Sequence, residues 1–237
     1  MTFTPPATPV LLHVCCAPCS GAIIEALCSQ GVRPTVFWSN SNIFSADENV
    51  RRIAVLRPFA ARFGVEVIED EYDHADWLTF VRDQLEAEES HVRGRLDRQT
   101  PDLASYSERG ARCGMCFRYR LLRAARYAAA NGFGCLTTSL ASSRWKSLEQ
   151  VDAAGSWSVA RANAEAAGAG DHAPATVSWW PQNWRKGGLQ ERRSAIIREE
   201  NFYNQTFCGC EFSLNHGRDE TCPATADTTE STNTKTI

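Results

Sequence analysis

The sequence predicts an α/β fold in which a three-layer, mostly parallel sheet carries helices on both faces. Short apolar runs typical of strands alternate along the chain with segments whose apolar residues recur every three to four positions, as in amphipathic helices. Glycines close several of the helical segments. Strands that alternate with helices form βαβ units, and these units build parallel sheets.

The amino-terminal part supplies three predicted strands, each followed by a helix. The first strand is the apolar run VLLHVCC, and the helix after it has Ser20 in the N-cap position and Gly31 as its terminator. The third strand alternates polar and apolar residues. The expected order is strand 10–16, helix 20–31, strand 34–43, helix 47–64, strand 65–73 and helix 75–89.

The same alternation resumes after a polar loop between Ser90 and Gly110. The expected order is helix 113–134, strand 134–140, helix 146–168, strand 175–180 and helix 189–201. One α/β domain is therefore expected over residues 8–214. Residues 215–237 are rich in threonine and almost free of apolar side chains, so they cannot offset the entropy of ordering and predict a disordered tail.

Composition narrows the class of protein. The formal charge of −3 argues against a protein that holds nucleic acid by bulk electrostatics, although local basic patches can still bind a few phosphates. No apolar run is long enough to span a membrane, and the first residues lack the features of a secretory signal, so we expect a cytoplasmic protein. In that reducing compartment, ten cysteines indicate metal or redox chemistry rather than disulfides.

Seven of the ten cysteines fall into three tight groups. These are Cys15, Cys16 and Cys19 in CCAPC, Cys113 and Cys116 in CGMC, and Cys208 and Cys210 in CGC. A structural zinc takes four protein ligands, whereas a [4Fe–4S] cluster uses four cysteines and leaves three for a second metal. The count favours a cluster with a neighbouring metal. Two zinc sites, or one zinc with a redox pair, remain the alternative.

The positions of these cysteines predict that the three segments converge. The first group follows the first strand, where functional groups of parallel sheets gather. Cys113 and Cys116 open a helix, and Gly209 allows a tight turn between its flanking thiols. Because neighbouring side chains of an extended segment point to opposite sides, Cys15 and Cys16 are expected to serve two centres, or a centre and its substrate, rather than one tetrahedral site.

Several specific motifs follow one another between about residue 11 and residue 214. They are LLHVCCAPCS, VIEDEYDHADW, RCGMCFRYRLLRAARYAAANGF, LTTSLASSRWKSLEQV and FYNQTFCGCEFSL. In these motifs and their order the sequence resembles the cobalamin-independent epoxyqueuosine reductases of the QueH family. The resemblance implies a fold similar to the adenine-nucleotide-hydrolase-like (HUP) domains. It also implies reduction of epoxyqueuosine to queuosine at the wobble position of tRNA, the last step of queuosine biosynthesis.

The resemblance further implies a [4Fe–4S] cluster and an additional iron ion. Cys15, Cys113, Cys116 and Cys208 then correspond to cluster ligands, and Cys16, Cys19 and Cys210 to ligands of the second iron, where catalysis is expected. Removal of the epoxide oxygen consumes two electrons, while such a cluster passes one at a time. An external electron donor, similar to ferredoxin or flavodoxin, is therefore expected to act twice.

Aromatic and basic residues after the fourth and around the fifth strand are candidates for binding the substrate. An unstacked RNA base is recognised by stacking on aromatic or guanidinium faces, and its phosphates by basic side chains. The alternative is that the tryptophans complete the core. His13 is expected in the core along the first strand. The candidate substrate-binding residues are Trp179, Trp180, Trp184, Arg185, Lys186, Arg144 and Lys146.

Two other functions remain open at this point. An iron–sulfur enzyme of tRNA thiolation would be expected to bind ATP through a glycine-rich phosphate loop, and CCAPCS supplies no such glycines. A zinc-bound RNA-binding module without catalysis would need the same thiols but no iron. No membrane partner is expected.

Overall fold

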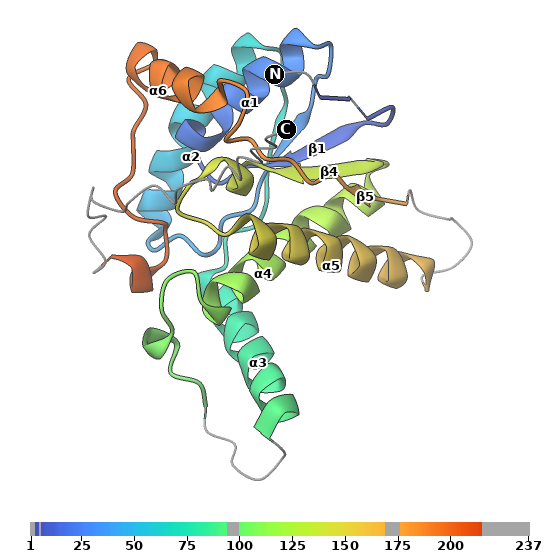
Figure 1. Cartoon of the computed structure of the whole chain (residues 1–237), viewed down its shortest axis with the longest axis vertical. Helices are drawn as coiled ribbons and strands as arrows, with labels where there is room; N and C mark the ends of the chain where they lie inside the picture. The colour runs from blue at the N-terminus through green and yellow to red at the C-terminus, as the bar shows by residue number, and fades with distance from the viewer. Residues whose placement is uncertain (1–2, 5, 94–99, 169–175, 215–237) are drawn as a thin grey trace, which may run out of the picture.

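Five parallel strands pair into one sheet at the centre of the computed structural model (Figure 1). The structure describes residues 3–4, 6–93, 100–168 and 176–214. The strand order is β3-β2-β1-β4-β5, and the predicted α/β class with a parallel sheet is confirmed. The strands are β1 (Val10–His13), β2 (Thr35–Trp38), β3 (Val67–Glu69), β4 (Cys135–Thr138) and β5 (Ser178–Trp179).

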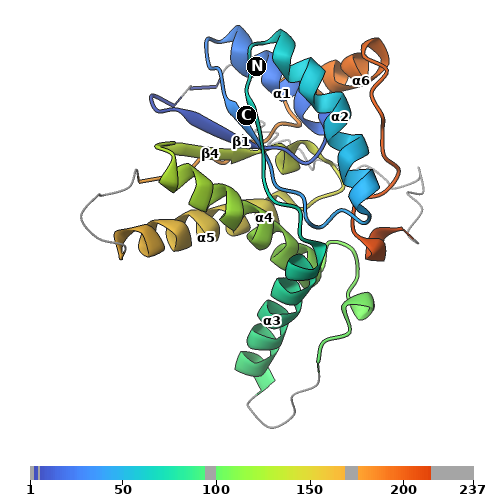
Figure 2. The same ribbon diagram turned by 180° about the vertical axis from the view of Figure 1, so that it is seen from behind.

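Helices cover both faces of the sheet. α1, α2 and α6 pack on one face, while α4 and α5 pack on the other, as Figures 1 and 2 show from opposite sides. α3 contacts α4 and extends away from the sheet. Within the described ranges, no helix is long and apolar enough to cross a membrane. The helices are α1 (Ala17–Ser29), α2 (Ala46–Arg62), α3 (His74–Arg93), α4 (Ala111–Ala130), α5 (Leu148–Ala167) and α6 (Leu189–Glu199).

The central strand shows how the two layers form. All four residues of β1 are buried. Because side chains alternate along a strand, Leu11 packs in the core beneath α4 and α5, and Leu12 packs in the core beneath α1 and α2. His13, at the end of the strand, has no exposed surface, as expected.

The order of the strands creates a switch point between β1 and β4. The chain leaves β1 toward β2 on one side of the sheet and leaves β4 toward β5 on the other side. In open parallel sheets, the crevice outside the strands' carboxyl ends at such a point is where ligands bind. The cysteines of residues 15–19 follow β1 at this edge, and the short 3₁₀ helix η2 (Ser139–Ser142) follows β4.

The first helix starts earlier than the sequence predicts. α1 begins at Ala17 with Cys16 as its N-cap, and Pro18 lies in its first turn, where its missing N–H costs nothing. Ser20 is therefore inside the helix, and its hydroxyl donates back to the carbonyl of Cys16 at 3.0 Å. Gly31 follows the helix with the left-handed φ of 79° that suits a terminator. The predicted tail, residues 215–237, lies outside the described residues.

Candidate metal centre

The first cysteine group lies at the carboxyl end of β1. The thiol sulfurs of Cys15, Cys16 and Cys19 all lie within 4.8 Å of one another and are buried. The sulfurs of the adjacent Cys15 and Cys16 are 3.9 Å apart, so both face the same space rather than opposite sides as the sequence predicted. The reason is that β1 ends at His13 and α1 begins at Ala17, so the two cysteines occupy a turn instead of an extended strand.

The second group combines two segments that lie far apart in the sequence. Cys113 and Cys116 sit on the first turns of α4, and Cys208 and Cys210 follow α6. All four line one narrow cavity together with Trp77 and Phe117. Nine cysteines lie in the described residues, and none of them forms a disulfide. The four thiols are therefore available as ligands.

A glycine gives the segment after α6 its shape. Gly209 has φ of 147°, which L side chains rarely adopt, and a Cβ there would lie 2.9 Å from the side-chain amide of Asn42. Its carbonyl also accepts a hydrogen bond from the amide of Phe44 at 2.8 Å. This turn directs Cys208 and Cys210 into the same cavity, as expected from the sequence.

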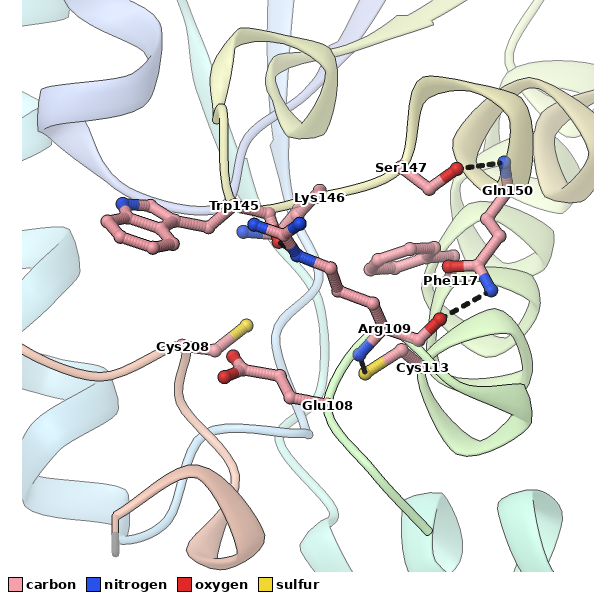
Figure 3. A pocket seen from close by; sticks show the side chains of 9 residues that line it. All are labelled: Glu108, Arg109, Cys113, Phe117, Trp145, Lys146, Ser147, Gln150 and Cys208. Atoms are coloured by element: carbon pink, nitrogen blue, oxygen red, sulfur yellow. Dashed lines mark hydrogen bonds between the residues drawn. The ribbon is translucent and has the colours of Figure 1, made fainter. Parts of the chain in front are cut away.

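The two groups adjoin each other through Lys146. Its side chain lines a second narrow cavity with Cys113 and Cys208 (Figure 3). Burial by itself would lower the pKa of Lys146, but the thiolates of both groups outweigh it, with Cys208 and Cys15 contributing most, so the pKa is raised. The ammonium group therefore lies within electrostatic range of both sets of thiols and would offset the negative charge of their thiolate forms.

Burial controls the protonation of the second group. Burial, followed by the negative charge of Cys208, raises the pKa of the Cys113 thiol to about 12. Burial also raises the pKa values of Cys116 and Cys210. In the first group the neighbouring thiols hydrogen-bond to Cys15 and hold its pKa well below the usual range. Because cysteine binds metal as thiolate, the thiols of Cys113, Cys116 and Cys210 need a cation to become deprotonated.

The comparisons with known proteins identify the family. The profile of the family described as epoxyqueuosine reductase QueH matches residues 10–216. The chain is 35% identical to epoxyqueuosine reductase QueH of Histophilus somni over 86% of this chain and 72% of the relative. It is 34% identical to that of Haemophilus influenzae, over 90% and 75%. It is 35% identical to that of Acinetobacter baylyi, over 88% and 81%.

The chain belongs to the epoxyqueuosine reductase QueH family. This confirms the resemblance found in the sequence. The relatives are named as reductases, and the chain is accordingly an oxidoreductase. All seven grouped cysteines lie within the matched residues.

The thiols of this QueH family member fit a soft, thiolate-binding metal group. Seven cysteines meet in two adjoining groups at one edge of the sheet, and no carboxylate is part of the tight group of three. Sulfur ligands of this kind select iron–sulfur clusters, iron or zinc rather than magnesium or calcium. The structure groups three cysteines at residues 15–19 and four in the second group. The resemblance instead assigns Cys15 to the cluster and Cys210 to the second iron.

Several residues that hold these thiols were not singled out from the sequence. The side-chain amide of Gln205 donates to the sulfur of Cys16 at 3.0 Å, and Ser139 accepts from the backbone N–H of Cys15 at 3.0 Å. Arg52 of α2, almost fully buried, donates to the carbonyl of Cys208 at 3.0 Å. The spacing of apolar residues shows which face of a helix packs on the core. It does not show which polar residue of that helix reaches a distant loop.

The predicted substrate-binding residues occupy different environments. Trp184 has no exposed surface and packs edge-on against Trp180, with ring centroids 5.7 Å apart, which favours the core alternative for it. Trp179 is half-buried and donates to the carboxylate of Asp152. Lys146 lies beside the thiols, as described above. Only two of the seven candidates are exposed, Arg144 and Lys186.

Arg185 has a positioning role that its sequence context did not reveal. Its guanidinium donates to the carbonyls of Ser143 at 2.5 Å and Lys146 at 2.6 Å. From the other side, Arg109 donates to the carbonyl of Trp145 at 2.9 Å. The loop between η2 and α5 is thus held by two arginines.

Proposed function

We propose that this protein reduces epoxyqueuosine to queuosine at the wobble position of tRNA, the last step of queuosine biosynthesis. The observation that carries the proposal is the meeting of seven cysteines from three distant segments at the switch point of a chain that belongs to the QueH family. The relatives are named for this reaction. Because the protein acts on tRNA and keeps its thiols reduced, we place it in the cytoplasm.

The seven cysteines are proposed to hold a [4Fe–4S] cluster and an additional iron ion. When bound, these groups would supply one-electron transfer and Lewis acidity at the epoxide oxygen. Cys113, Cys116 and Cys208 belong to the cluster set in both the family-based partition and the grouping of the structure, and Cys16 and Cys19 belong to the iron set in both. Cys15 and Cys210 exchange places between the two partitions.

The distances support a single ion within the first group. Sulfurs that share one tetrahedral ion at about 2.3 Å are separated by roughly 3.8 Å. The separation of 3.9 Å between Cys15 and Cys16 matches that geometry. The four thiols of the second group line one narrow cavity, so all of them can reach a group bound there.

The surroundings of the thiols prepare the site for charge transfer. Lys146 places a positive charge against the negative thiolates, so electrons can be accepted with a smaller electrostatic cost. Trp77, fully buried, and Phe117 line the cavity of the second group and limit the access of water. Two electrons and two protons are needed for each epoxide, with oxygen lost as water. A ferredoxin- or flavodoxin-like protein is the proposed donor of the electrons.

The decisive experiment follows the substrate's mass. Anaerobically purified, metal-loaded protein is incubated with epoxyqueuosine-containing tRNA and a chemical reductant, and the modified nucleoside is analysed by mass spectrometry. Loss of one oxygen atom is expected. A Cys113→Ala protein is the matched control and should leave the nucleoside unchanged. If the metal-loaded protein also leaves the mass unchanged while the reductant works, the proposed function is wrong.

Metal analysis separates this function from a zinc-bound RNA-binding module. The iron–sulfur enzyme should be brown and contain iron and sulfide after anaerobic purification. A colourless protein that retains zinc and binds RNA would support the non-catalytic alternative.

A further inference from the structure

A cavity of about 720 Å³ lies beside the first cysteine group. Loop 142–145 after β4, the first half of α6 and segment 204–207 form its wall, together with Leu214. These segments are distant in the sequence and meet only in the fold. Cavities that hold ligands the size of a nucleotide generally measure several hundred Å³, so the volume is sufficient for one.

The cavity adjoins the cysteines through two polar residues in its wall. Gln205 lines it and donates to the sulfur of Cys16 at 3.0 Å. Ser142 lines it as well, and its hydroxyl donates to the carbonyl of Cys19 at 2.9 Å. Through these two side chains the cavity wall reaches the sulfur of Cys16 and the backbone of Cys19.

The charges that line the cavity favour an anion. Arg144 is exposed and Arg193 is half-buried, and neither guanidinium forms an ion pair with a carboxylate of the described residues. The Nε of Arg193 is buried without a hydrogen-bond partner in that part of the chain. Glu191 is the acidic residue among those lining the cavity. Two unpaired guanidinium groups against one carboxylate suit phosphate groups.

The wall also offers an aromatic surface on a loop that is held in place. Trp145 is half-buried and lines the cavity, with the guanidinium of Arg144 5.6 Å from its ring centroid. The loop's carbonyls are fixed by Arg185 and Arg109, as described above, and Gln190 of α6 donates to the carbonyl of Ser142 at 2.8 Å. A rigid loop holds the indole in position for stacking before the ligand arrives.

We propose that this cavity binds the anticodon loop of the tRNA. An unstacked nucleoside enters it, Trp145 stacks on a base, and Arg144 and Arg193 contact the neighbouring phosphates. The assignment rests on the proposed function and adds to it the place where the RNA binds. It replaces Trp184 by Trp145 as the stacking residue, because Trp184 is in the core.

Binding of epoxyqueuosine-containing tRNA to the metal-loaded protein, measured at several salt concentrations, tests the phosphate contacts. Arg144→Ala and Arg193→Ala should each weaken binding and reduce the steepness of the log–log salt dependence by about one. Arg198 is an exposed arginine that shares α6 with Arg193 but does not line the cavity. Arg198→Ala should change neither the affinity for tRNA nor its salt dependence. Unchanged binding in the two cavity variants, or an equal change in all three, would overturn the proposal.

The stacking contact has its own pair of variants. Trp145→Ala should weaken tRNA binding roughly 5- to 150-fold, which corresponds to the 1–3 kcal/mol of a stacked base. Trp145→Phe keeps an aromatic face and should retain most of the affinity. Iron content and the visible spectrum should equal those of the unaltered protein in both variants. Equal affinities for the alanine and phenylalanine proteins would contradict stacking by this residue.

The reduction assay keeps this inference distinct from the proposed function. If the variants bind tRNA more weakly but the unaltered protein never reduces epoxyqueuosine, the cavity assignment holds and the proposed reaction is wrong. If the unaltered protein reduces it and the variants bind normally, the cavity assignment is wrong. Normal tRNA binding with slower reduction by a protein electron donor would assign the cavity to that donor and likewise overturn the proposal.

Discussion

His13 illustrates how one buried side chain connects the sheet to the metal edge. It ends β1, two residues before Cys15, and is completely buried. Its Nε2 lies 3.2 Å from the carbonyl of Ser39, which can only accept, so Nε2 carries the proton and Nδ1 accepts from the hydroxyl of Thr138 at 2.7 Å. A neutral imidazole satisfies both bonds. Burial, assisted by the positive charge of Arg120, lowers the pKa of His13 to about 3.

This shift predicts acid sensitivity of the metal-free, reduced protein. Below about pH 6.5 the unfolded state binds a proton at this histidine and the folded state does not, so the free energy of unfolding falls by up to about 1.4 kcal/mol per pH unit. The loss continues until the folded-state pKa of about 3 is reached. Denaturant titrations between about pH 7 and pH 5 should therefore show a shallower decline for His13→Asn.

The unaltered protein, titrated over the same pH range, provides the reference for that measurement. Equal pH dependence of the His13→Asn protein and the unaltered protein would show that His13 is not the group responsible.

At the scale of the elements, α5 packs closely against β5. A Cβ on Gly155 of α5 would lie 2.3 Å from the indole of Trp179 in β5. Trp179 is fixed by its hydrogen bond to Asp152, also on α5. The glycine thus lets the helix pack directly on the ring.

Gly155→Ala is predicted to destabilise the fold by about 1–3 kcal/mol, because the methyl group forces a rigid ring to move. Alanine would otherwise favour a helix by up to about 1 kcal/mol over glycine, so a loss of stability reports the clash. Gly168→Ala, at the end of the same helix, meets no atom closer than 3.6 Å and should change stability little. Thermal unfolding of the two variants measures the difference; an equally stable Gly155→Ala protein would contradict the packing.

A second contact between elements positions the last cysteine segment. Arg52 of α2 pairs with Glu48 one turn earlier at 2.7 Å and stacks on Phe207 at 4.8 Å, while donating to the carbonyl of Cys208. Mutation of a residue that orients a metal ligand without binding the metal itself typically lowers metal affinity about 10- to 100-fold. α2 therefore helps to position the cysteine segment after α6, although none of the seven grouped cysteines lies on α2.

Arg52→Met keeps the buried aliphatic stem but removes the donors, so metal affinity is expected to fall about 10- to 100-fold. Iron and sulfide are measured after reconstitution, alongside far-ultraviolet circular dichroism to verify the fold. Arg51→Met is the matched control, since Arg51 is exposed and its guanidinium lies over the ring of Tyr203, 5.3 Å from its centroid. Full metal loading of the Arg52 variant would show that the segment is held without it.

At the scale of the whole molecule, the two cysteine groups predict separable losses. Cys113→Ala should remove the brown chromophore, since this residue belongs to the cluster set in both partitions. Cys19→Ala should keep the chromophore but lose the separate iron and most activity. Cys19→Asp should recover part of both, because carboxylate also binds iron.

Iron analysis and visible spectra of the purified variants measure these losses. Cys28→Ala provides the control, because this cysteine lies within α1 away from both groups, and it should keep all its iron. Loss of the chromophore in both Cys19→Ala and Cys113→Ala would refute the division into two centres. The same spectra of Cys15→Ala and Cys210→Ala decide which of these two completes the cluster.

The sequence by itself determined the α/β class, the order of strands and helices and the set of seven cysteines. These follow from local patterns: apolar periodicity, glycine terminators and cysteine spacing act over a few residues. It also placed Cys113 and Cys116 at the start of a helix and His13 in the core. The start of α1 was misplaced, because Ser20 resembles an N-cap although the helix already begins at Ala17, with Pro18 in its first turn.

Only the tertiary structure decided how the three cysteine segments meet and which polar residues surround them. The close approach of Cys15 and Cys16, the position of Lys146 between the groups and the reach of Arg52 to Cys208 depend on contacts between segments far apart in the chain. Likewise, Trp145 and Trp184 have similar sequence surroundings, yet one lines a cavity and the other is buried. Local sequence sets the preferences of a segment, whereas the packing of the sheet and its helices fixes which side chains share a space.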